Sequence, residues 1–170
     1  ERNRSEPRGI VRVSCPVTLV ETQVGRMIAD FMVRHPQVEI HLEATNRAVD
    51  VVAEAIDIAI RVRPPPLEDS DLVLRVFSER AQRLVASPAL LDANGAPSSP
   101  EDLARLPSLA LGPPQQEHAW RLYDADGGSA IVRHRPRLVT GNMTALREAA
   151  VAGVGVVQLP GMVVTEQLAR

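Results

Sequence analysis

The sequence has few aromatic residues and one cysteine, and both shortages narrow the functions open to it. Its 170 residues include two Phe, one Trp and one Tyr, too few for a surface on which nucleic-acid bases stack. Cys15 has no second cysteine for a disulfide, and no Cys-x-x-Cys motif is present for zinc or redox chemistry. The formal net charge of −2 provides no bulk positive charge for binding a phosphate backbone.

Long apolar runs are also absent. No segment reaches the ~18 continuous apolar residues of a membrane span, and the charged residues 1–9 lack the apolar core of a secretion signal. We therefore expect a cytoplasmic protein with no membrane partner, unless a leader has been removed. Hydrophobic residues make up 45% of the chain and charged residues 24%, a balance typical of a folded globular protein.

The first 62 residues predict a strand-helix-strand-helix-strand order. A β-branched strand over 9–15 is followed by a loop over 16–20. From Glu21 the spacing becomes helical, with apolar residues at i, i+3, i+4, i+7 and i+8, namely Val24, Met27, Ile28, Phe31 and Met32. Pro36 stops this helix.

A second helix is predicted between the next two strands. Residues 38–44 alternate apolar and polar side chains, which is typical of a half-buried strand. Asn46 is the expected N-cap of a helix that continues to about Ala55, with Asp50 in its first turn. Residues 56–62 predict a fully buried strand. The order implies a parallel sheet with right-handed crossovers.

The rest of the chain predicts a second group of strands and helices. Short helices are expected after the Ser-Pro pairs at 87–88 and 99–100, and a helix capped by Asn142 is expected to run from Met143 to Ala152. A last helix begins near Gly161. Strands are expected at 72–77, 83–87, 108–111, 118–123, 130–134 and 154–160. We therefore expect a linker remnant over 1–8, a first lobe over 9–84 and a second lobe over 85–170.

Four segments together resemble the effector-binding region of LysR-type transcriptional regulators. They are GIVRVSCPV, VEIHLEATNRAVDVVAEAIDIAIRV, RLVASPALLDANGAPSSPEDLARL and NMTALREAAVAGVGVVQLP, in this order and spacing. The resemblance runs from about Gly9 to Arg170. It implies an α/β fold of the type 2 periplasmic-binding-protein class, with two lobes of mostly parallel sheet flanked by helices and a small effector between them.

The resemblance also implies partners and missing parts. Family members have an N-terminal winged helix-turn-helix domain, and only that domain would contact DNA. Their effector region continues beyond the position of Arg170, so the return of the chain to the first lobe is expected to be missing here. The family implies a homodimer that packs lobe one against lobe two, and a tetramer in the full-length protein. It implies no cofactor.

Candidate effector contacts in the first lobe follow the predicted strand ends. Pro16, Val17 and Thr18 follow the first strand, and Thr18 matches a family position whose hydroxyl often bonds the anionic group of the effector. Such a position also suits a carboxylate physically, because backbone N–H groups are free at a helix N-terminus, although Thr18 could equally be a plain loop residue. Asn46 matches another family contact position or is only an N-cap, and Arg47 is an anion partner or a solvated side chain.

The remaining candidates are Arg61 and residues of the second lobe. Arg61 ends a buried strand, where its charge needs a partner: an effector carboxylate, Asp57 or Glu43. In the second lobe, Asn142 either contacts the effector or only caps its helix, and Thr144 stands beside it. Leu159 and Pro160 are expected to line the cleft with apolar surface.

Other reactive residues favour structural roles. Cys15 is expected to be a buried, inert thiol, and Trp120 a core residue rather than a ligand platform. The four histidines have no metal-ligand spacing, and His41 lies on a solvated strand face. Since no nucleophile has a positioned base, we expect no enzyme. The alternatives are a solute-binding transport receptor of the same fold, or a small α/β transferase or hydrolase.

Overall fold

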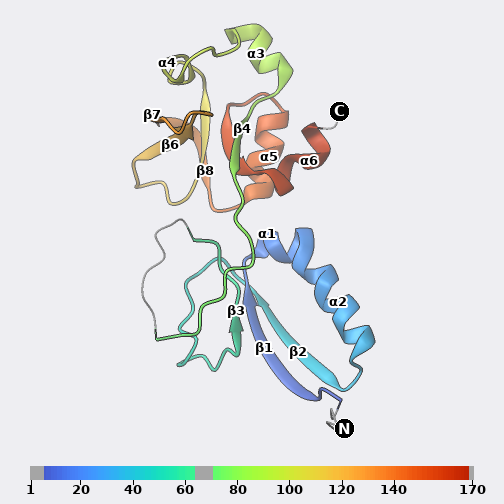
Figure 1. Ribbon diagram of the computed structural model, residues 1–170. Helices are drawn as coiled ribbons and strands as arrows, with labels where there is room; N and C mark the ends of the chain where they lie inside the picture. The colour runs from blue at the N-terminus through green and yellow to red at the C-terminus, as the bar shows by residue number, and fades with distance from the viewer. Residues whose placement is uncertain (1–5, 64–70, 169–170) are drawn as a thin grey trace. The chain divides into compact units, whose positions relative to one another are not determined.

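The computed structural model describes residues 6–63 and 71–168, and the chain forms two compact units (Figure 1). The first unit ends at Val76 and the second begins at Phe77. This boundary lies ahead of the expected one at residue 84, because strand β4 (Gln82–Val85) pairs with β9 (Val157–Pro160) of the second unit. None of the helices in the described residues is long and apolar enough to cross a bilayer.

The first unit is built on the predicted parallel sheet. Strand β1 (Gly9–Cys15) lies between β2 (Val38–Ala44) and β3 (Ile58–Ala59), and both neighbours run parallel to it. Val13, Ser14 and Cys15 at the end of β1 are buried. The expectation of a fully buried third strand is wrong. Only two residues of β3 pair, and Ile58 is 48% exposed because β3 is the edge strand of this three-stranded sheet.

The first helix begins earlier than predicted. Helix α1 (Val17–Leu19) starts directly after Pro16, so the expected loop over 16–20 is wrong. The Pro16 carbonyl accepts hydrogen bonds from the Leu19 and Val20 amides, which starts the helix. A π-helical segment η1 (Val20–Val24) follows, and then α2 (Gly25–Arg34). The wider turn shifts the phase of the apolar side chains, so the regular spacing that identified the helix begins only at Val24.

The second predicted helix does not form. Residues 48–50 are irregular and 51–55 make a single turn. Asp50 accepts hydrogen bonds from the amides of Val52 and Ala53, an arrangement that closes a local turn. Ala55 has a φ of 52°, which ends the turn. The run Val49, Val51, Val52 is β-branched and favours a helix only weakly.

Over residues 77–168, the second unit contains three two-stranded sheets. Strand β5 (Ser108–Leu111) pairs parallel with β8 (Pro136–Thr140), and β6 (His118–Tyr123) pairs antiparallel with β7 (Ser129–His134). The β4–β9 pair is antiparallel. Strand β8 was not predicted from the sequence. Residues 72–77 are irregular instead of the predicted strand, since they pair with none of these sheets, and Val73 is fully exposed.

The helix caps of the second unit are confirmed. Ser87 caps α3 (Pro88–Asn94), and Ser99 forms a capping box with Asp102 at the start of α4 (Pro100–Leu103). Helix α5 (Met143–Val151) and helix α6 (Gly161–Leu168) lie side by side (Figure 1). Two buried clusters form the core. One is centred on Leu109, Leu146, Val157 and Leu159, and the other on Leu90, Leu106, Trp120 and Val132.

Gly155 marks a close approach of two backbones in the second unit. A Cβ at this position would stand 2.8 Å from the Pro107 carbonyl oxygen and 3.0 Å from the Ser108 nitrogen. The Val156 amide donates to that same carbonyl at 2.8 Å. The sequence Val-Gly-Val therefore needs glycine here, because a side chain would separate β5 from the bridge at Val156.

We expect Gly155→Ala to destabilise the second unit by roughly 1–3 kcal/mol, the usual cost of forcing extra atoms into a packed site. Gly141→Ala is the matched control, because nothing lies within 4 Å of its added Cβ. Thermal unfolding followed by circular dichroism measures both variants. Equal melting temperatures for the two would contradict the close approach.

Candidate functional site

The candidate residues of the first unit gather at one edge of its sheet. Parallel strands end at the same edge, and the residues after β1, β2 and β3 are hydrogen-bonded to one another there. The Thr45 amide donates to the Cys15 carbonyl at 2.9 Å, and the Ile60 amide donates to the Ser14 carbonyl at 2.8 Å. In open α/β sheets this is the edge at which ligands bind.

Asn46 holds the start of the first helix. Its Oδ1 accepts a hydrogen bond from the Val17 amide at 3.2 Å, so it caps α1 rather than the predicted helix after it. The first orphan amide of α1 is thereby satisfied by a residue 29 positions later in the chain. Asn46 therefore joins the end of β2 to the end of β1, which is a positioning role.

Thr18 follows in the first turn of α1 and is half-buried. Its carbonyl accepts a bond from the Thr22 hydroxyl at 2.7 Å. Within the described residues its own hydroxyl makes no hydrogen bond. Its hydroxyl therefore keeps a donor available for a ligand.

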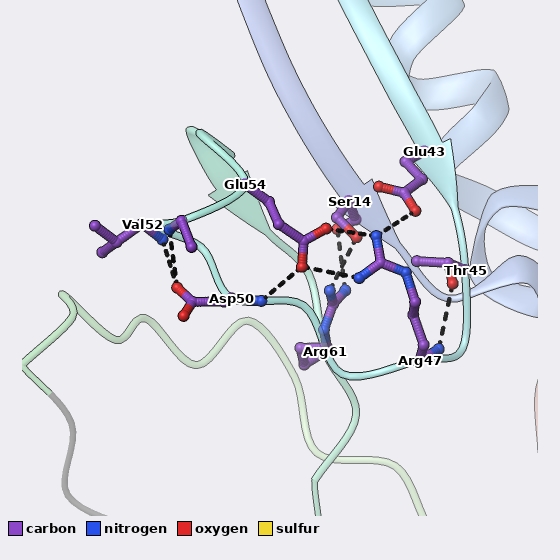
Figure 2. A network of polar contacts seen from close by, with 9 residues as sticks. Ser14, Glu43, Thr45, Arg47, Asp50, Val52, Glu54 and Arg61 are labelled. Atoms are coloured by element: carbon purple, nitrogen blue, oxygen red, sulfur yellow. Dashed lines mark hydrogen bonds and ion pairs between the residues drawn. The ribbon is translucent and has the colours of Figure 1, made fainter.

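Arg47 is held by two carboxylates (Figure 2). Its guanidinium donates to both carboxylate oxygens of Glu54, at 2.8 and 2.5 Å, and to Glu43 at 2.9 Å. The Asp50 amide also donates to Glu54, at 2.9 Å. These bonds lower the pKa of Glu54 to about 2, with Arg47 as the largest cause. Arg47 thus connects Glu43 at the end of β2 to Glu54 in the loop before β3, an arrangement we call the clasp at Arg47. The two carboxylates already compensate its charge.

Arg61 lies beside this network but has different partners (Figure 2). Its guanidinium donates to the Ser14 hydroxyl at 2.9 Å, to the Ser14 carbonyl at 3.3 Å and to the carbonyl of Ile60. All three oxygens are neutral. Within the described residues no carboxylate lies within the 4.0 Å of an ion pair with Arg61.

The two acids considered for Arg61 have other partners. Asp57 accepts from the Arg12 amide at 2.7 Å, and Glu43 pairs with Arg47. Arg61 is nevertheless half-buried, and a half-buried charge held only by neutral oxygens is open to an anionic partner.

Cys15 is buried completely, as predicted. Burial raises the pKa of its thiol, and the nearby charge of Arg61 offsets only part of that rise. Since the thiolate is the reactive form, the structure supports an inert role.

In the second unit, Asn142 and Thr144 stand at the start of α5. Asn142 Oδ1 accepts from the Ala145 amide at 2.9 Å, which is the predicted cap. The backbone amide of Asn142 donates to the Thr140 hydroxyl at 3.1 Å. Thr144 is half-buried. Leu159 has no exposed surface and lies in the core, so it offers none to a ligand, whereas Pro160 is partly exposed.

The sequence interpretation missed a pair of histidines. His118 and His134 lie opposite each other on β6 and β7, and His134 stacks on Trp120. Trp120 is buried, as predicted. The signal was available, because His118 and His134 are at equal distances from the turn over 124–128 that joins the two strands. His41, by contrast, is exposed as expected and pairs with Glu39 at 2.6 Å. No group of three metal-ligating side chains occurs in residues 6–63 or 71–168.

Comparison with known proteins identifies the family. Residues 4–170 match the model of the LysR substrate-binding domain. The chain is 27% identical to the HTH-type transcriptional regulator CrgA of Neisseria meningitidis serogroup B over 164 residues, which cover 96% of the chain and 54% of CrgA. The solved structure of CrgA superposes with a TM-score of 0.79 over 96% of this chain and 54% of that one. The regulatory domain of AphB in Vibrio vulnificus gives 27% identity and a TM-score of 0.79 over 95% of this chain and 79% of that one.

The chain therefore belongs to the LysR substrate-binding domain family, and it has the predicted α/β fold of these regulatory domains. This family consists of transcriptional regulators rather than enzymes, which decides between the alternatives that the sequence left open. The chain spans about half the length of the curated relatives it matches.

The clasp at Arg47 gives a prediction for Glu54. Arg47→Gln should raise the pKa of Glu54 from about 2 toward its ordinary value of 4.5. The pKa should remain below 4.5, because the Asp50 amide still donates a hydrogen bond to the carboxylate. A carboxylate with a lowered pKa contributes stability above its unfolded pKa and loses it as pH falls through the folded one. Carboxyl-detected NMR titration measures the shift.

The control is Arg26→Gln, which removes an exposed pair with Asp30 in α2. It should leave the titration of Glu54 unchanged. If Glu54 titrates alike in the Arg47→Gln variant and the original chain, the clasp does not exist in solution.

Proposed function

We propose that this chain is the sensor of a LysR-type transcriptional regulator and that it binds a small organic anion with a carboxylate group. Arg61 supports this most directly, since its guanidinium lies at the edge where open α/β sheets generally bind ligands and its hydrogen bonds go only to neutral oxygens. Thr18 adds a hydroxyl with no partner among the described residues. A carboxylate could accept from both groups, and charge-assisted hydrogen bonds are the stronger kind.

The other candidates divide by what they already bind. Asn46 and Arg47 are engaged with Val17, Glu43 and Glu54, so we propose that they position the edge rather than hold the effector. Pro16 and Val17 would contribute backbone and apolar contact. We propose Asn142, Thr144 and Pro160 of the second unit as further effector contacts.

The proposed mechanism is a shift between conformations. A bound effector would favour the conformation of the protein to which it binds more tightly, and only that difference in affinity can move the equilibrium. In a full-length homodimer or tetramer, such a shift would change the spacing of the DNA-binding domains and so the choice of half-sites.

Calorimetric titration of the 170-residue chain with a panel of aromatic and aliphatic carboxylates tests this proposal. For any acid that binds, we expect Thr18→Ala and Arg61→Gln each to weaken binding about tenfold, the loss of roughly 1.4 kcal/mol of hydrogen bonding to a charged group. The corresponding primary amide should bind more weakly than the acid, because it lacks the charge.

Thr165→Ala is the matched control. Its hydroxyl bonds the Gly161 carbonyl within α6, as that of a helical threonine often does, and should not affect binding. Unchanged affinity in both Thr18→Ala and Arg61→Gln, with melting temperatures preserved, would place the effector elsewhere. Equal affinity for acid and amide would reject an anionic effector while leaving the site intact.

A further inference from the structure

The β6–β7 hairpin of the second unit places two histidines on the face that packs into the core. His118 and His134 are opposite each other in the register, with ring centroids 6.2 Å apart. Side chains two residues apart on a strand share a face. His118 therefore shares its face with Trp120, and His134 shares its face with Val132, and both of these neighbours are buried.

The environment of the pair suits neutral imidazoles. The His134 ring stacks on Trp120 with centroids 4.0 Å apart, and its Nδ1 lies 2.8 Å from the hydroxyl of Ser108, which is 1% exposed on β5. Nε2 of His118 is buried and has no hydrogen-bond partner among the residues that the structure describes. A buried polar atom without a partner destabilises the folded state.

No counter-charge compensates protonation of this pair. In the described residues, neither histidine forms an ion pair with a carboxylate. Strands β5 and β9 have no charged residue. Tyr123 and Asp124 lie at the far end of the hairpin, at the turn. The charged residues on or next to β6, β7, β8 and α4 are Glu117, Arg121, Arg133, Arg135, Arg137, Glu101 and Asp102.

Glu101, Glu117, Arg135 and Arg137 are exposed, and the other three are turned away or already engaged. Arg121 and Arg133 alternate with the inward residues, so they point to the opposite face of the hairpin and are exposed. Asp102 accepts hydrogen bonds from Ser98 and Ser99. A proton taken up by either histidine would therefore place a charge in a partly buried site beside a second imidazole.

We propose that the His118–His134 pair is a pH-sensitive switch: it holds the β6–β7 hairpin against β5 and Trp120 while both rings are neutral, and releases it when acid charges them. This inference is independent of the effector site. Burial, and secondarily the charge of His118, lower the pKa of His134.

The direction of the pH dependence follows from that lowered pKa. An unfolded histidine takes up its proton near pH 6.5, and the folded chain resists protonation until lower pH. The contribution to stability is therefore complete above about pH 6.5 and is lost as the pH falls through the lowered pKa of the folded state.

Trp120 reports the switch, because it is the only tryptophan of the chain. We expect its fluorescence, followed from pH 8 to pH 5 in the 170-residue chain, to show one transition with a midpoint below about 6.5. His134→Gln should abolish the transition. His118→Gln should raise its midpoint, because the neighbouring charge is removed. His41→Gln is the control and should leave the transition unchanged, since His41 is exposed in the first unit.

Ring proton NMR of the unmodified chain keeps the test independent of whether the variants fold. Titration of His134 at or above pH 6.5 would overturn the proposal. A fluorescence transition that persists in folded His134→Gln, or a melting temperature that is equal at pH 7.5 and pH 5, would also overturn it.

Discussion

The parallel pairing of β1 with β2 and β3 is the constraint on which the first unit depends. It brings the ends of three segments, up to 47 residues apart, to one edge, where Arg61 reaches Ser14 and Asn46 reaches Val17. Each of these contacts satisfies a group that the sheet or the first helix would otherwise leave unpaired. The edge is thus built from the residues that complete the fold, and little of its polar capacity remains for a ligand.

Two arginines at this edge differ in function because their partners differ. Arg47 faces two carboxylates, and its bonds to Glu54 lower the pKa of that group to about 2. Arg61 donates hydrogen bonds only to neutral oxygens, and the nearby Glu54 carboxylate interacts with it through charge alone. A matched ion pair in solvent contributes little binding energy to a third group, whereas an unmatched guanidinium retains its attraction for an anion. The distinction depends on which acids the loop between β2 and β3 brings near, and sequence position alone does not show it.

Local signals in the sequence predicted the elements that depend on local chemistry. The caps at Ser87, Ser99 and Asn142 need only a few neighbouring residues, and each is present. The same reasoning wrongly predicted a helix after Asn46, because its Oδ1 accepts a hydrogen bond from the Val17 amide, 29 residues earlier in the chain. It failed at residues 72–77 as well, since β propensity requires a neighbouring strand and these residues join none of the sheets described.

The histidine pair also depends on contacts between residues that are distant in the sequence. Neither position 118 nor position 134 shows a signal by itself. The register of the hairpin places the two histidines opposite each other on neighbouring strands. Their burial follows from Trp120, whose large ring must pack inward and therefore takes the whole alternating face of β6 with it. A core residue thus fixes the environment of two titratable groups. Any substitution that turns Trp120 outward would expose both imidazoles and return the pKa of His134 toward its ordinary value, because burial is the first cause of its lowered pKa.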